Sequence, residues 1–234
     1  MRLATPTKRP GSAATPSTGI RSQILEAALA EFGEHGFGDA SLAAIARKLG
    51  VTAPLLLYHF GSKANLWREA VDVLMLRCAT VIEAAVEDGR NMDGASALRL
   101  VLRRFVYFLA ANRAMYRLLR DEGAADHESR EWLVSRHLAP LFGQLETIYD
   151  RAVADGGLRA APFHTTIFMI LGSASQYLES RSLVSSLYGR YEVGAQALAA
   201  YAEQVIDFCF EGIASDHNWH AHSGQTDALR VAVG

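Results

Sequence analysis

Side chains suited to binding phosphate gather between residues 41 and 63, at the ends of two short predicted helices. They offer hydroxyl, imidazole and ammonium groups at helix starts or on an exposed helix face, where helix-terminal N–H groups can also meet phosphate oxygens. This chemistry is contact with a nucleic-acid backbone, and it needs no catalytic step. With one residue of a preceding helix included, the predicted DNA contacts are Arg21, Ser41, Lys48, Thr52, Ala53, Pro54, Leu57, Tyr58, His59 and Lys63.

The helices that hold these residues are predicted from apolar residues that recur every three or four positions. Ser41 is a good N-cap for one helix, and Gly50 supplies the turn after it. Thr52 caps a second helix, with Pro54 in its first turn. Two helices joined by such a short turn are typical of a helix-turn-helix that sits on DNA. The apolar side chains expected to hold it together are Ile45, Leu49, Val51, Leu56 and Phe60.

The same periodicity continues through most of the chain, and no strand alternation stands out. One helix precedes the pair and is expected to close at Gly36 in a left-handed conformation, and a long helix runs from Lys63 toward Glu87. The predicted fold is all-α: a small three-helix helix-turn-helix head on a larger helical bundle. Further helices are predicted near 95–111, 113–123, 127–155, 162–181 and 194–213.

Composition and charge support a head that faces DNA. Half of the 234 residues are apolar, which is enough for a sizeable core. Residues 1–66 carry seven basic and four acidic side chains, a net charge of +3, while the remainder carries −5. Residues 1–19 are rich in Pro, Gly, Ser and Thr, so we expect a disordered basic arm, for which an inert tail is the alternative.

Membrane, secreted and metal-bound classes are not favoured. No apolar run reaches the ~18 residues that span a bilayer, and the first twenty residues lack the apolar stretch of a secretion signal. Cys78 and Cys209 have neither disulfide-framework nor zinc-type spacing, which favours a reducing cytoplasm. The tail histidines His217, His220 and His222 are a weaker candidate for a metal site than for a polar end without function.

Three pieces of the chain stand in a recognisable order and spacing. They are Ala28 to Gly36, Ser41 to Val51 (SLAAIARKLGV) and Tyr58 to Leu66 (YHFGSKANL). Together they make the segment from Arg21 to Trp67 resemble the N-terminal domain of TetR-family transcriptional regulators. This resemblance implies a homodimer joined by the last two long helices, with an inducer pocket inside the body.

The second helix of the pair departs from the family pattern. Members usually carry a small polar residue at the position of Leu55 and commonly a tyrosine at that of Leu57. Leu56 to Tyr58, like Ile167 to Ile170, instead resembles the branch that includes the pyrimidine-utilisation regulator. This helix has few hydrogen-bonding side chains, so base reading is expected from contact with thymine methyls and from DNA shape.

Two body helices carry more apolar residues than one buried face needs. Helix 162–181 is apolar around much of its circumference, and helix 194–213 shows the same excess. Two copies of each would make a four-helix dimer interface. Burial of both helices inside a monomer is the alternative.

An effector pocket is expected where aromatic residues occur with few polar groups. His137 or Gln176 would orient the ligand, and a solid core is the alternative. The predicted pocket residues are Phe105, Phe108, Tyr116, Trp132, His137, Phe168, Gln176 and Tyr177.

These patterns predict a disordered arm (1–19), a DNA-binding head (20–66), a helical ligand-binding and dimerisation domain (67–214) and a flexible tail (215–234). The predicted function is that of a dimeric cytoplasmic repressor, without cofactor, which a small-molecule effector releases from an inverted-repeat operator in double-stranded DNA. The alternatives are an activator, or a small-molecule-binding or protein-interaction module that does not read sequence. An enzyme is not favoured, because no Glu-x-x-His pair, phosphate-binding glycine loop or Gly-x-Ser-x-Gly occurs.

Overall fold

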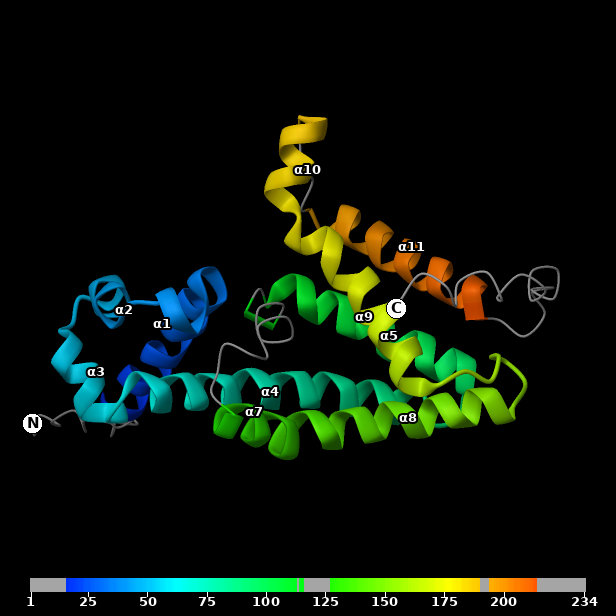
Figure 1. Cartoon of the computed structure of the whole chain (residues 1–234), viewed down its shortest axis with the longest axis horizontal. Coiled ribbons are helices and arrows are strands. Elements are labelled where there is room, and N and C mark those ends of the chain that lie inside the picture. The colour runs from blue at the N-terminus through cyan, green and yellow to red at the C-terminus, as the bar shows by residue number, and fades with distance from the viewer. Residues whose placement is uncertain (1–15, 113, 116–126, 190–193, 214–234) are drawn as a thin grey trace, which may run out of the picture.

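The computed structural model describes residues 16–112, 114–115, 127–189 and 194–213, and every regular element in this part of the chain is a helix. The all-α prediction is therefore confirmed. Three helices form a head at one end of the molecule, and α4 leads from it into a larger body (Figure 1). The elements are α1 (Pro16–Asp39), α2 (Leu42–Leu49), α3 (Ala53–Phe60), α4 (Lys63–Asp88), α5 (Gly94–Ala111), α7 (His127–Leu133), η1 (Val134–Leu138), α8 (Ala139–Ala154), α9 (Phe163–Glu179), α10 (Arg181–Tyr188) and α11 (Ala195–Ile213).

The head is held together by a small apolar cluster drawn from all of its helices. Leu49 and Val51, two of the predicted core residues, lie partly buried at its edge. Gly36 has the predicted positive φ, 77°, but its ψ is 172°, and α1 continues past this kink to Asp39 instead of ending at Gly36. The fully buried members of the cluster include Ile24, Ala28, Ile45, Leu56, Phe60 and Leu66.

The start of α1 corrects one predicted boundary. The arm was expected to extend through residue 19, but α1 begins at Pro16. A proline is well tolerated in the first turn of a helix, because its missing N–H has no partner there and its φ is already helical. The Pro, Gly, Ser and Thr content of residues 1–19 favours a non-helical arm, and composition alone does not show that the last four of them join a helix.

The body corrects two more predictions. The single helix predicted over 127–155 is divided into α7, the wide π-turn η1 and α8. Pro140, in the first turn of α8, has no N–H to donate and its ring would crowd the carbonyl four residues earlier, so the wider turn just before it relieves this conflict. The helix α10 was not predicted at all. By contrast, α5, α9 and α11 match their predicted ranges to within two residues at each end.

Several expectations lie outside the described residues. They are most of the arm, most of the helix predicted at 113–123, the pocket residue Tyr116, and the tail from 215 onward with its histidines.

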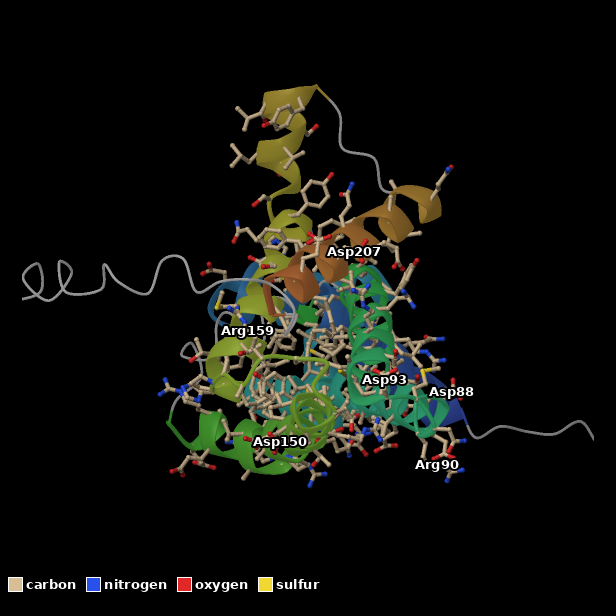
Figure 2. All side chains as sticks on the ribbon, turned by 90° about the vertical axis from the view of Figure 1, so that its right-hand side faces the viewer. Asp88, Arg90, Asp93, Asp150, Arg159 and Asp207 are labelled. Atoms are coloured by element: carbon tan, nitrogen blue, oxygen red, sulfur yellow. The ribbon has the colours of Figure 1, made fainter. Side chains whose placement is uncertain are left out.

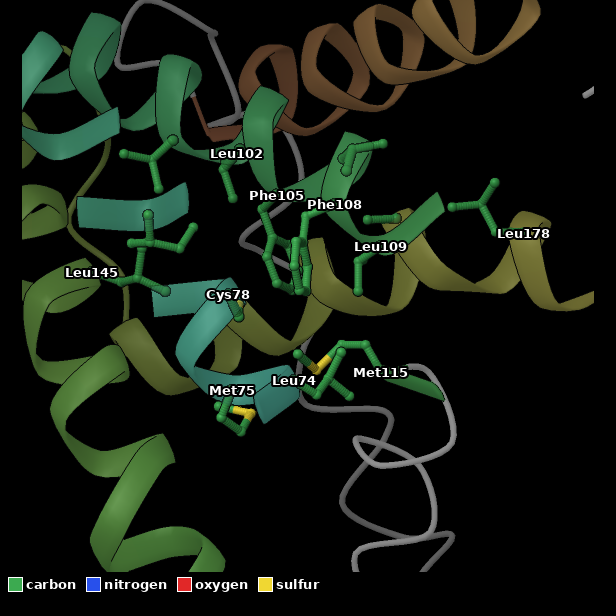
Figure 3. Close-up of a cluster of buried hydrophobic side chains, with 14 of the residues drawn as sticks. Leu74, Met75, Cys78, Leu102, Phe105, Phe108, Leu109, Met115, Leu145 and Leu178 are labelled. Carbon is green, nitrogen blue, oxygen red and sulfur yellow. The ribbon is translucent and has the colours of Figure 1, made fainter. Parts of the chain in front are cut away.

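The body packs α4, α5, α8 and α9 around a shared apolar core, part of which Figure 3 shows between Met75, Phe105 and Leu145. Gly94 permits the closest approach, since a Cβ at this residue would lie 2.3 Å from the backbone nitrogen of Ala152. Across the other side of α5, Arg103 clamps α11 through two hydrogen bonds to Glu203, at 2.5 and 2.8 Å. The body is therefore a tightly joined set of helices, one of which also belongs to the head.

Candidate functional site

The helix-turn-helix is built from two capped helices and a glycine turn. The Ser41 hydroxyl accepts a hydrogen bond from the N–H of Ala44 at 3.3 Å, which starts α2 as predicted. Gly50 ends α2 at φ 66°, and the N–H of Val51 donates to the Ala46 carbonyl at 3.0 Å. This three-residue turn brings α3 back across α2, with Leu56 and Phe60 facing the core.

The outward face of α3 presents apolar and aromatic side chains to solvent. Tyr58 is 83% exposed and Leu57 is 42% exposed. Pro54, also exposed, lies three and four positions before them and so shares their face. The Thr52 hydroxyl makes no capping hydrogen bond and stays available to a partner, while Ala53 and His59 are half-buried beside the face. Large apolar side chains held in water on a short rigid helix are typical of a contact surface.

The predicted phosphate-binding cations all have partners within the chain. Arg21 donates to the His59 carbonyl at 3.2 Å, pairs with Glu69, and lies over the Phe60 ring. The Lys63 ammonium donates to the Gly38 carbonyl at 3.0 Å. These side chains therefore brace α1 against α3 and α4. They stay partly exposed, so phosphate contact would add to the bracing role.

Glu31 joins two helices of the head, a role that the sequence interpretation missed. Its side chain is only 4% exposed, and it accepts hydrogen bonds from the Lys48 ammonium at 2.9 Å and the Ser41 N–H at 3.3 Å. The hydrogen bond from Lys48 is the main reason why the pKa of Glu31 lies below its ordinary value of 4.5. This carboxylate fixes α1 to both ends of α2, and Lys48 serves that junction. A glutamate within the apolar stripe of a helix was the available signal.

A narrow apolar cavity lies in the body between α4, α5, α8 and α9. Its volume is about 20 Å³, close to the space that one water molecule needs. The side chains around it are apolar apart from one thiol, and burial raises the pKa of that thiol, Cys78, to about 12. The lining includes Met75, Cys78, Phe105, Leu145, Ile167 and Leu171.

The structure does not bring together the seven predicted pocket residues that it describes. Only Phe105 lines the cavity, and Phe108 is buried next to it in the core (Figure 3). The His137 Nε2 lies 2.8 Å from the Asp72 Oδ1, and the Trp132 ring packs on Trp67 at 6.0 Å, so both residues fasten the α7–η1 segment to α4.

Three other members of the predicted set lie on α9, toward solvent. Phe168 is 60% exposed, Tyr177 stacks on Tyr201, and the Gln176 amide donates to the Ser180 hydroxyl at 3.0 Å. Residue type alone does not show which side of a helix faces a cavity, so the predicted anchors His137 and Gln176 lie away from it.

Among the described residues, several large apolar side chains are exposed on the outer side of the body. They belong to α9, to α10, which projects from the body, and to one residue of α11 (Figure 1). Most apolar residues of α11 pack inward, and Val205, Ile206 and Phe210 are buried. The exposed surface consists of Phe168, Met169, Tyr177, Leu183, Leu187, Tyr188 and Phe208, and is called the outer apolar surface below.

No group of three or more His, Cys, Asp or Glu side chains that could hold a metal ion is found among the described residues. None of the helices described is long and apolar enough to cross a membrane.

Two family models match this chain. Residues 24–70 match "Bacterial regulatory proteins, tetR family", and residues 95–209 match "Tetracyclin repressor-like, C-terminal domain". Between them, the models cover the head and most of the body.

Individual relatives agree with the models. The chain is 53% identical over 51 residues to the HTH-type transcriptional regulatory protein RaaS of Mycobacterium tuberculosis, an alignment that covers 22% of this chain and only 23% of RaaS. It is 28% identical to the nucleoid occlusion factor SlmA of Alteromonas mediterranea, over 62% of this chain and 72% of SlmA. The solved structure of HlyIIR, a hemolysin II transcriptional regulator, superposes with a TM-score of 0.63 at 21% identity, covering 82% of this chain and 97% of that one.

Proposed function

This chain belongs to the TetR family of DNA-binding transcriptional regulators, and from that premise we propose that it is a dimeric repressor released from its operator by a small molecule. Two heads of a dimer would occupy half-sites of an inverted repeat, about 34–36 Å or a multiple apart. An effector in the body would favour a head separation that no longer fits those half-sites. Because its partner is chromosomal DNA, we expect the protein in the cytoplasm. Its assignment to the branch of the pyrimidine-utilisation regulator stays a prediction.

The observation that carries the DNA proposal is the outward face of α3. Leu57 and Tyr58 would enter the major groove, where apolar side chains contact thymine methyls and a phenol reaches phosphate. Ser41, Thr52 and Lys63 surround this face at three helix starts. This arrangement supports a head that is positioned by contacts to the DNA backbone and that reads few bases through hydrogen bonds.

A gel shift tests this proposal directly. The protein should bind the DNA upstream of its own gene more tightly than random DNA at physiological salt. Lys63→Ala should weaken binding to all sequences and lower the salt slope by about one, as expected for one lost phosphate contact. Equal affinity for both DNAs would favour a binding module that does not read sequence, and an unchanged salt slope would remove the phosphate role of Lys63.

The outer apolar surface supports the dimer. An eight-residue helix such as α10 gains little stability by itself, and its Leu183, Leu187 and Tyr188 remain mostly exposed in the described part of one copy. A second copy of the chain related by two-fold symmetry would cover this surface with its own. The proposed interface is therefore α9 and α10 with the exposed edge of α11.

A matched pair of variants tests the interface. Met169 on the outer apolar surface and Leu76 on α4 are almost equally exposed, at 69% and 68%. Met169→Glu should give a monomer in light scattering and lower operator affinity by about 100-fold, because avidity is lost. Leu76→Glu should leave the dimer intact. A dimeric Met169→Glu protein would contradict the interface.

A further inference from the structure

A second hollow opens at the end of the body remote from the head. It is a groove of about 310 Å³ between the last turns of α4, the start of α5 and the second half of α8. Figure 2 faces this end of the molecule and shows Arg90 at its surface. The groove differs from the inner cavity in carrying polar side chains, among them Arg90, Gln144, Thr147 and Arg151.

The groove and the inner cavity lie next to each other along the same three helices, α4, α5 and α8. On each helix, one residue that lines the cavity lies three or four positions from one that lines the groove. Three or four residues of α-helix correspond to about 5–6 Å, so one turn separates the two hollows. Since the same helices line both, side chains form the partition between them. The pairs are Ile82 and Val86 on α4, Val101 and Ala97 on α5, and Leu145 and Ile148 on α8.

Arg151 gives the groove an unsatisfied positive charge. Its Nε is buried and has no hydrogen-bond partner, and no described carboxylate lies within ion-pair distance of its guanidinium. The one acidic side chain of the groove, Glu87, is 3.2 Å from Arg90 and is paired with it. An anionic group in the groove would pair with this partly exposed guanidinium and give it the charged partner that it lacks among the described residues.

We propose that the effector is an anionic amphiphile, with a single apolar chain in the inner cavity and a carboxylate or phosphate head group on Arg151. This inference rests on the proposed effector-responsive function and names the chemical class of the effector. The inner cavity is too small for a chain as it stands, so the chain displaces flexible lining side chains such as Met75 and Met115. The bound chain thereby moves α4 away from α8. Because α4 also belongs to the head, its movement is transmitted to the head.

Calorimetry on the full-length protein without DNA tests the proposal, with dodecanoate, dodecyl phosphate, dodecan-1-ol and acetate as probes. At least one of the two anionic amphiphiles should bind about tenfold or more tightly than the alcohol, because a charge-assisted hydrogen bond is gained. Acetate should bind only weakly. Comparing the carboxylate with the phosphate shows which head group is preferred. From octanoate to dodecanoate, each added methylene should tighten binding about fourfold, as expected for burial of the chain.

The variants Arg151→Ala and Arg99→Ala assign the head-group site. Arg151→Ala should abolish the advantage of the anionic probes over the alcohol, while Arg151→Lys should keep part of it. Arg99→Ala removes an equal charge on the far side of α5, where Arg99 pairs with Asp207, and should retain the full advantage. Equal binding of alcohol and anions by the unmodified protein, or no binding of any probe, would overturn the inference. Specific operator binding in the gel shift would still stand in either case.

Discussion

The head and the body place their contact surfaces by different means. The face of α3 comes from one continuous segment in which Leu56 and Phe60 turn inward and Leu57 and Tyr58 turn outward. The cavity and groove of the body join side chains from three different helices, α4, α5 and α8. A local surface follows from helical periodicity, whereas a shared hollow depends on how distant helices pack. The two regions should therefore fail separately when they are mutated.

The largest difference between the head and the body is expected from the variant Leu56→Ala, which changes only the head. Leu56 is fully buried in a small cluster, so removing its side chain should cost about 2–5 kcal/mol of head stability. Operator binding should be lost while the dimer, measured by light scattering, persists. The body counterpart is Leu145→Ala, which enlarges the cavity and should leave the operator affinity of the ligand-free protein nearly unchanged. Loss of the dimer in Leu56→Ala would show that head and body fold as one unit.

The next effect is expected at Glu31, which joins α1 to α2. Glu31→Gln should lower the free energy of unfolding by about 1–3 kcal/mol at neutral pH, because a buried charge-assisted pair with Lys48 is lost. The pKa of Glu31 is lowered in the folded protein, so its contribution is present above pH 4.5 and disappears as the pH falls through the lowered pKa. Chemical denaturation at several pH values should thus show the variant and the original converging in acid. A constant difference would contradict the ionised pair.

The contrast between a local surface and a shared hollow also explains which features could be predicted from the sequence alone. The caps Ser41 and Gly50, the core residues Leu56 and Phe60, and the positive φ of Gly36 follow from local patterns and appear in the structure. Local patterns do not identify a partner seventeen positions away, as for Glu31 and Lys48. They also do not identify the partition between the two hollows of the body, which depends on the packing of three helices. Residue type therefore grouped aromatic side chains that the fold distributes over the core, the α4 contact and the outer apolar surface.

A smaller and purely functional effect is expected at Tyr58. Because its side chain is 83% exposed, Tyr58→Ala should leave the melting temperature unchanged. Operator affinity should fall by about 1–2 kcal/mol through lost apolar contact and a lost hydrogen bond to phosphate. Tyr58→Phe separates these two contributions, since it keeps the ring. If Tyr58→Ala bound the operator normally, the outward face of α3 would not be the reading surface.

The smallest effect is expected at the two cysteines, where the body should show no response. Burial raises the pKa of Cys78 to about 12 and also raises that of Cys209, so both thiols are neutral at neutral pH, and the thiolate is the reactive form. Alkylation of the native protein, followed by mass spectrometry, should leave both thiols unmodified until denaturant is added. Mild peroxide should likewise leave operator affinity unchanged. If peroxide oxidised Cys78 and the protein then released its operator, the inner cavity would be a redox site. Protection of both thiols agrees instead with a cavity that accepts an apolar chain.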